Sequence, residues 1–262
     1  MSIHLDQYGY PTWSTSSFLI GNKTVSLELI HKLIKEYINM HSLGEGHNIR
    51  YHAKRYLMTL YYIEKYKIKT GTIFEAGGKS VFTYLIENIL PDVNVIHSCS
   101  NLQDNIHVSN GAISSILCME VLEHISDGKI NHHFEFQGVF QMLKSFHDAL
   151  KDDGLLLLTS PNIIGCYSFE KLLNKRNPML YYKHVREYSP REIKLILEHA
   201  GFDVLELKTE NVFLDKDYKY TLRLLDKSGF STEDRGEDII VIAKKSNSSI
   251  DTSTFEKELF NL

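Results

Sequence analysis

From Thr72 onward, the sequence alternates between short apolar runs and segments with helical periodicity. The run at 154–162, GLLLLTSPN, is apolar almost throughout, as expected of a central parallel strand covered on both faces. Such regular alternation predicts an α/β fold with a doubly wound sheet. The expected strands are at 72–75, 93–98, 112–118, 154–162, 204–209 and 238–245, and the expected helices at 81–89, 140–150 and 190–200, the last capped by Ser189 to Glu192.

The N-terminal part has a different texture. Residues 24–69 contain no proline, and apolar side chains recur at nearly one helical turn from Val25 to Tyr37 and again over 51–66. These two amphipathic helices are expected to cover the ligand edge of the sheet. The predicted organisation is therefore an N-terminal segment and helical cap at 1–70, a core at 71–246 and a tail at 247–262.

Composition excludes several classes of protein. The chain has 262 residues, a net charge of -4 and a pI near 6.3, without a basic excess that would bind nucleic acid. Its three cysteines have no paired or metal-binding spacing, which is typical of a reducing compartment. The N-terminus lacks a signal-peptide pattern, and no apolar run approaches membrane-spanning length. We therefore expect a cytoplasmic globular protein.

Two strand ends carry residues suited to chemistry, and ligands of open α/β sheets bind at such ends. The first end is Glu75 followed by Gly77 and Gly78. These glycines permit a tight turn and close approach to a ligand, and the carboxylate suits a cationic ligand better than a phosphate. The alternative is a plain strand-to-helix turn.

The second end is CMEVLEH, at 118–124. A helix that begins near Glu120 places Glu120, Glu123 and His124 on one face, at i, i+3 and i+4. Carboxylates in a first helical turn also stabilise the helix dipole, which explains one glutamate without any function. That explanation is less adequate for a second glutamate beside a histidine.

Four blocks of sequence together resemble class I S-adenosylmethionine-dependent methyltransferases. They are EAGG, ILCMEVLEHISD, FQMLKSFHDALKDDGLLLLTSPN and HVREYSPREIKLILEHAGFDV, and they occur in the order typical of that family. The resemblance is strongest to the branch that methylates sugars of surface polysaccharides. It implies a Rossmann-like, seven-stranded sheet, complete or abbreviated between strands two and four, and S-adenosylmethionine as cofactor.

The resemblance also implies roles for individual residues. Glu75, Gly77 and Gly78 match the motif that holds the methionine part of the cofactor. The second strand lacks the family's usual acidic residue, and the SNLQ segment offers Asn101, followed by Leu102, in place of an aspartate. In the N-terminal part, Arg50 and Tyr51 resemble positions that reach the cofactor's carboxylate, although a surface arginine and a packing tyrosine are the alternative.

The E-x-x-E-H pattern, followed much later by His184, is similar to the metal site of small-RNA 3′-terminal 2′-O-methyltransferases. That likeness implies a divalent cation (Mn²⁺, Fe²⁺ or Mg²⁺) held by Glu120, Glu123, His124 and His184. Metal-free relatives carry the same EVLEH motif. Without a metal, His124 or His184 is the expected catalytic base, with Glu120 as its orienter.

The leading hypothesis is an O-methyltransferase that acts on a sugar hydroxyl, with a nucleotide-linked or glycan-attached sugar as the small-molecule substrate and no nucleic acid or membrane partner. The alternatives are an RNA 2′-O-methyltransferase and an inactive methyltransferase-like scaffold. Two further sets of residues have open roles. His132 and His133 belong to the active-site rim or to an ordinary surface loop, and Tyr8, Tyr10 and Trp13 form an aromatic lid or pack on the cap.

Overall fold

The protein divides into two compact units, which are described separately. The first comprises Met1–Gly71, Lys79–Val95 and Glu210–Asp217, and the second comprises Thr72–Gly78, Ile96–Thr209 and Tyr218–Leu262. The computed structural model describes residues 12–13, 16–43, 48–98, 102, 106, 108–127, 136–213, 216–247 and 250–260.

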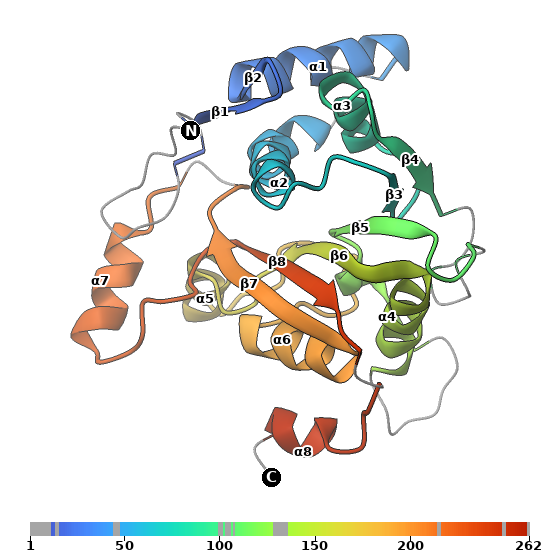
Figure 1. Cartoon of the computed structure of the whole chain (residues 1–262). Coiled ribbons are helices and arrows are strands. Elements are labelled where there is room, and N and C mark those ends of the chain that lie inside the picture. Colours follow the sequence, from blue (N-terminus) through green and yellow to red (C-terminus); the bar gives the residue numbers. More distant parts are fainter. Residues whose placement is uncertain are drawn as a thin grey trace. The chain divides into compact units, whose positions relative to one another are not determined.

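The main sheet has six strands among the described residues, in the order β4-β3-β5-β6-β8-β7 (Figure 1). β3 and β6 lie parallel to β5 on its two sides, whereas β8 runs antiparallel to β6. The α/β sheet predicted from the sequence is confirmed in its abbreviated, six-stranded form. The strands are β3 (Thr72–Glu75), β4 (Asn94–His97), β5 (Ile113–Met119), β6 (Leu150–Pro161), β7 (Phe202–Glu210) and β8 (Asp238–Lys245).

Burial on both faces explains the apolar character of β6. Leu156 and Leu158 belong to one core, and Leu157, which points to the other face, is equally buried. The helices α4 (Gln137–Ala149) and α6 (Pro190–His199) supply apolar side chains to the first core. Figure 1 shows both helices on the same side of the sheet.

The helix α6 begins as its sequence predicts. The Ser189 hydroxyl accepts a hydrogen bond from the Glu192 N–H, and the Glu192 carboxylate accepts one from the Ser189 N–H. This capping box, with Pro190 in the first helical position, fixes where the preceding loop ends. Two other helices of the second unit are not among those expected from the sequence: α5 (Cys166–Leu173) and α7 (Lys219–Lys227). A further helix, α8 (Phe255–Phe260), lies in the C-terminal tail.

The first unit contains the two predicted N-terminal helices, α1 (Leu27–Met40) and α2 (Ala53–Lys65), the latter preceded by the 3-10 helix η1 (Asn48–His52). It also contains α3 (Val81–Ile89), which has the predicted bounds. The expectation that Val25 begins a helix is wrong. Val25 lies in β2 (Lys23–Ser26), which forms an antiparallel hairpin with β1 (Ser17–Ile20).

Trp13 packs inside the first unit. Its side chain is 1% exposed, its ring lies 5.6 Å from that of Tyr61, and its Nε1 donates to the Glu210 carboxylate at 3.3 Å. The Tyr62 hydroxyl donates to the other oxygen of that carboxylate at 3.2 Å. For Trp13, the packing alternative is therefore confirmed. Tyr8, Tyr10 and Cys99 lie outside the described residues.

The first unit also holds a histidine whose protonation is coupled to folding. His52 lies against the Phe213 ring, and its Nδ1 is 3.3 Å from the Arg55 guanidinium. Burial, followed by the charge of Arg55, lowers the pKa of His52 from 6.5 to about 3. A folded state that resists protonation loses stability as pH falls below the unfolded pKa near 6.5.

We expect the free energy of unfolding to decrease by about 2 kcal/mol between pH 7 and pH 5 on account of His52 alone. Urea titrations of the wild type and of His52→Gln, which retains an acceptor for Arg55, measure this contribution as the difference between their pH profiles. His31→Gln, a change at an exposed histidine of α1, is the matched control and should follow the wild type. A His52→Gln profile as steep as that of the wild type would contradict the expectation.

Candidate active site

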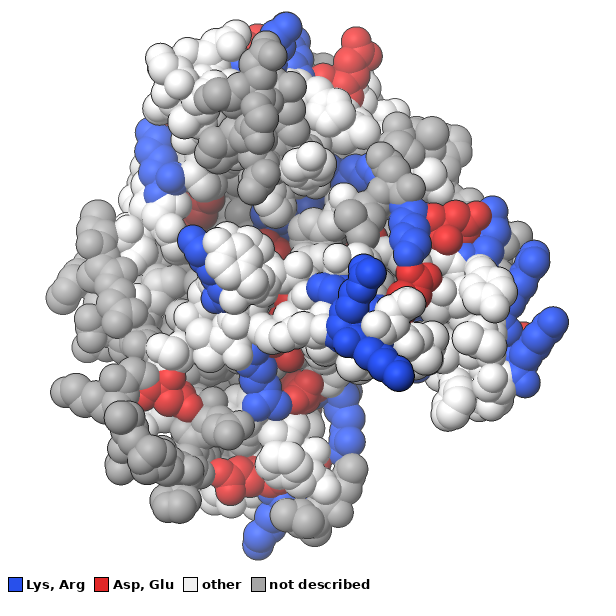
Figure 2. All heavy atoms as spheres, turned by 180° about the vertical axis from the view of Figure 1, so that it is seen from behind, with Lys and Arg blue, Asp and Glu red and all other residues white. Residues whose placement is uncertain are grey.

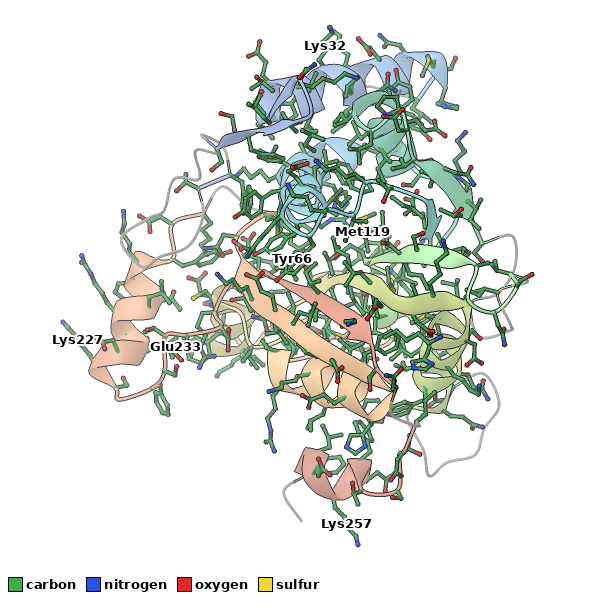
Figure 3. The ribbon with its side chains drawn as sticks, viewed as in Figure 1. Lys32, Tyr66, Met119, Lys227, Glu233 and Lys257 are labelled. Carbon is green, nitrogen blue, oxygen red and sulfur yellow. The ribbon has the colours of Figure 1, made fainter. Side chains whose placement is uncertain are left out.

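The ends of β3 and β5 form the first part of the site. Glu75 is buried where β3 ends, and Met119 marks the end of the parallel neighbour β5 (Figure 3). Gly77 and Gly78 follow with φ of +91° and +92°, a backbone conformation that residues other than glycine rarely adopt. A Cβ on Gly77 would also lie 3.2 Å from the Val121 Cγ2 atom. The turn therefore needs glycine, and it leaves room for close approach of a ligand.

The end of β4 adds a residue that the sequence did not single out. His97 Nδ1 lies 3.8 Å from the Glu75 Oε2 atom. A histidine thus stands where the resemblance led us to look for an acidic side chain. The available signal in the sequence is the histidine near the end of VNVIHS.

The helix expected from Glu120 does not form. Glu120 has a φ of +55°, and its N–H donates to the Thr159 carbonyl of β6 at 3.1 Å. Only the single 3-10 turn η2 (Leu122–His124) follows among the neighbouring described residues. The sequence pattern predicts a helix here. Instead, the hydrogen bond to β6 accompanies a left-handed backbone conformation at Glu120.

This backbone separates the two glutamates. The Glu120 carboxylate accepts from the Thr159 hydroxyl at 2.8 Å, whereas that of Glu123 accepts from the Ser160 hydroxyl at 3.1 Å. Successive residues of a strand point to opposite faces of its sheet. Glu120 therefore lies on the other side of β6 from Glu123, and the prediction of one shared face is wrong.

Glu123, His124 and His184 do come together. One ligand atom from each lies within 4.8 Å of the others, and Glu123 is fully buried. The rings of His124 and His184 are 4.8 Å apart, edge to face. The structure thus brings together three of the four predicted metal ligands and leaves Glu120 outside the group.

Backbone hydrogen bonds bring the two segments together. The Glu123 carbonyl accepts from the Val185 N–H at 2.8 Å and from the Arg186 N–H at 3.3 Å. These bonds hold the segment around His184 against η2. This approach is not predictable from either segment alone, because it depends on pairing between residues far apart in the chain.

Glu187 orients His184 and was missed in the sequence. Its Oε1 lies 2.6 Å from His184 Nδ1 and also accepts from the N–H groups of Leu180 and Tyr181. The carboxylate is buried, so this bond is shielded from water. An imidazole engaged through Nδ1 keeps Nε2 as its lone-pair nitrogen. The spacing H-x-x-E was the available signal.

The electrostatics of the group favour neutral imidazole. Partial burial, followed by the neighbouring His184, lowers the pKa of His124 below its ordinary value of 6.5. Neutral imidazole is the form that ligates a metal or accepts a proton. His124 is therefore in the required neutral state at neutral pH.

The geometry of the group fits a divalent cation. Ligand atoms bound to one ion at about 2.1 Å lie up to about 4.2 Å apart. Three atoms within 4.8 Å of one another need only small side-chain rotations to reach such an arrangement. Two imidazoles and one carboxylate leave coordination positions open for substrate oxygens.

Other residues with predicted roles lie elsewhere or are not described. Leu102 is buried in the core of the second unit, and Tyr51, in the first unit, is 69% exposed. Leu102, which was expected to contact the cofactor, therefore packs in this core. Asn101, His132, His133 and the side chain of Arg50 lie outside the described residues.

The fold and the site match the chemistry of methyl transfer, and comparison with known proteins identifies the family. A family profile for a methyltransferase domain matches residues 44–207, more than half of the chain, which therefore belongs to this family. The protein is an S-adenosylmethionine-dependent methyltransferase. No curated protein sequence matches the chain.

Two solved structures with a TM-score of 0.50 show the same fold at low sequence identity. A putative sarcosine dimethylglycine methyltransferase from Galdieria sulphuraria is 13% identical, with a TM-score of 0.50, over 82% of this chain and 99% of that chain. The small RNA methyltransferase HEN1 is 13% identical, with a TM-score of 0.50, over 76% of this chain and 26% of that chain. An S-adenosylmethionine-dependent methyltransferase from Archaeoglobus fulgidus is 16% identical, with a TM-score of 0.49, over 72% of this chain and 94% of that chain.

None of the helices in the described residues combines the length and apolarity needed to cross a bilayer.

Proposed function

We propose that the protein transfers the methyl group of S-adenosylmethionine to a sugar hydroxyl, which is activated at Glu123, His124 and His184. One observation carries the proposal: ligand atoms of a buried carboxylate and two imidazoles, from distant segments of the chain, converge within 4.8 Å. Burying a carboxylate costs free energy, so such a group is not expected from core packing alone.

The chemistry explains why a hydroxyl substrate needs this group. The sulfonium of the cofactor already carries a good leaving group, so the protein must align the acceptor and assist loss of its proton. An alcohol has a very high pKa, and a base or a metal is needed to deprotonate it near neutral pH. A divalent cation, when bound, would supply that acidity. Glu123, His124 and His184 would hold it, and Glu187 would keep the His184 ring oriented.

For the cofactor, we propose that Glu75, Gly77 and Gly78 hold the methionine part. The buried carboxylate complements the positively charged amino group, and the positive φ angles of the glycines permit close backbone approach. The proposal extends to Asn101 for the ribose hydroxyls and to Arg50 for the cofactor carboxylate, on the strength of the sequence resemblance.

The choice of a sugar rests on the resemblance of the chain to the sugar-methylating branch. The alternative is a ribose 2′-hydroxyl of RNA. A panel of nucleotide-linked sugars, free glycans and RNA oligonucleotides, assayed for release of S-adenosylhomocysteine, tests the choice. Turnover confined to amine acceptors would contradict O-methylation altogether.

We expect Glu75→Gln to weaken S-adenosylhomocysteine binding by at least about tenfold, or about 1.4 kcal/mol, because the neutral amide cannot balance the ligand's amino group. Isothermal titration calorimetry measures the effect. Glu233→Gln, a change at an exposed carboxylate of the same unit (Figure 3), is the matched control and should bind as the wild type does. Unchanged affinity in folded Glu75→Gln would remove Glu75 from the cofactor site.

A further inference from the structure

The segment from Lys171 to Arg186, which contains His184, has an unusual charge. It holds five basic residues and no acidic one, in a chain whose net charge is -4. Arg186 is paired with Glu192 at 2.7 Å, and Lys171 is bonded to the Met179 carbonyl. The remaining basic residues are exposed and have no acidic partner among the described residues: Lys175, Arg176 and Lys183.

Aromatic side chains lie between these basic residues. Tyr182 is 82% exposed and Tyr181 is 40% exposed, with ring centroids 4.7 Å apart. The Tyr181 ring is 5.4 Å from that of His184, and the Lys183 Nζ lies 5.8 Å from the Tyr182 centroid. Exposed tyrosine rings offer apolar faces on which a flat ligand can stack. The pair thus begins beside the proposed reaction centre and continues to the surface.

Hydrogen bonds hold this segment in place. Lys171 Nζ bonds the Met179 carbonyl, Glu187 accepts from two backbone N–H groups, and the Glu123 carbonyl fixes Val185. A surface that is ordered before binding avoids part of the entropy cost of ordering on binding. Figure 2, which shows the face turned away in Figure 1, has several Lys and Arg side chains near its centre, with both uncharged and acidic side chains beside them.

We propose that Lys175, Arg176 and Lys183 bind phosphate groups of the methyl acceptor while Tyr181 and Tyr182 stack on its ring, so that the substrate is a phosphate-linked sugar. The inference rests on the proposed function, because it uses the same reaction centre. It assigns the negative part of the substrate to this segment and the reacting hydroxyl to the group at His184.

Charge complementarity favours a small phosphate ester over a nucleic-acid strand. Proteins that bind nucleic acid chiefly through the backbone neutralise on the order of 6–10 phosphates. Three uncompensated cations match one or two phosphate groups, and the surrounding chain is acidic overall. A nucleoside diphosphate sugar has this charge together with a ring for stacking.

The test uses calorimetric titration of the S-adenosylhomocysteine-saturated protein with uridine 5′-diphosphate and with inorganic pyrophosphate. Uridine is the neutral comparison. The variant is Lys175→Gln with Arg176→Gln and Lys183→Gln, which changes exposed side chains only. The control makes the same charge change at exposed lysines of α4, α6 and α8: Lys144→Gln, Lys194→Gln and Lys257→Gln, of which Lys257 points into solvent (Figure 3).

We expect both phosphate probes to bind the wild type and the control equally, and to bind the segment variant about tenfold more weakly. Binding should weaken further with added salt. Tyr182→Ala should weaken uridine 5′-diphosphate and leave pyrophosphate unchanged. Equal binding by the segment variant, or no binding of either probe, would overturn the inference. Tighter binding of a single-stranded RNA with a steeper salt dependence would overturn it in favour of RNA. Chelator-sensitive methylation of a neutral sugar would keep the proposed function while removing the phosphate site.

Discussion

Removal of divalent cations should lower methyl transfer by about a hundredfold or more, and addition of Mn²⁺, Fe²⁺ or Mg²⁺ should restore it. The reason is the group formed by Glu123, His124 and His184, whose ligand atoms lie within 4.8 Å of one another. Without a cation, the hydroxyl retains its proton at neutral pH. The measurement is release of S-adenosylhomocysteine before chelation with EDTA, in its presence and after each metal is returned.

Variants of the group should behave as one unit. His184→Ala and Glu123→Gln should each lose about as much activity as chelation, and EDTA should have little further effect on either. Glu120→Gln is the informative control, because Glu120 lies on the opposite face of β6 and bonds Thr159. It should keep the chelator sensitivity of the wild type. Full activity in EDTA would eliminate the cation and leave direct base catalysis by a histidine, and wild-type activity in His184→Ala would remove the group from the reaction.

Elements defined by local pattern were predictable from the sequence. α3 at 81–89 and β8 at 238–245 have the predicted bounds, because an N-terminal serine cap and a run of β-branched residues determine them locally. The hairpin of β1 and β2 was missed although the signal was present. Gly21, with a φ of +56°, makes the tight turn between the two strands. The apolar residues that follow at helical spacing include Val25, which is why the sequence pattern assigns Val25 to the helix and not to β2.

The candidate site was predictable in residue type but not in arrangement. Periodicity placed Glu120, Glu123 and His124 on one helical face, but pairing with β6 placed the glutamates on opposite faces. The approach of His184 depends on hydrogen bonds between η2 and a distant segment, which no spacing within either segment reports. Sequence reasoning names candidate side chains by residue type, whereas long-range pairing decides which of them meet.

Glu187 lies only three residues from His184, and its contact with His184 gives the second large expected effect. Glu187→Gln should lower the affinity for the activating metal by about 10- to 100-fold, as is typical when the partner of a ligating histidine is changed. The neutral amide is a weaker acceptor than the carboxylate that lies 2.6 Å from His184 Nδ1, so the ring is less firmly oriented and its other nitrogen is a poorer ligand.

The metal concentration that gives half-maximal activity measures this effect and separates it from damage to the fold. We expect Glu187→Gln to shift that concentration upward and to regain most of its activity at saturating metal, since the ligands themselves remain. Glu192→Gln is the matched control: it removes the ion pair with Arg186 a few residues away while its amide can still complete the α6 capping box, and it should lower the melting temperature without moving the metal midpoint. If both variants shift the midpoint equally, general loosening of the segment explains the effect. If neither does, His184 needs no orienting carboxylate, and its bond to Glu187 serves only to fold the loop.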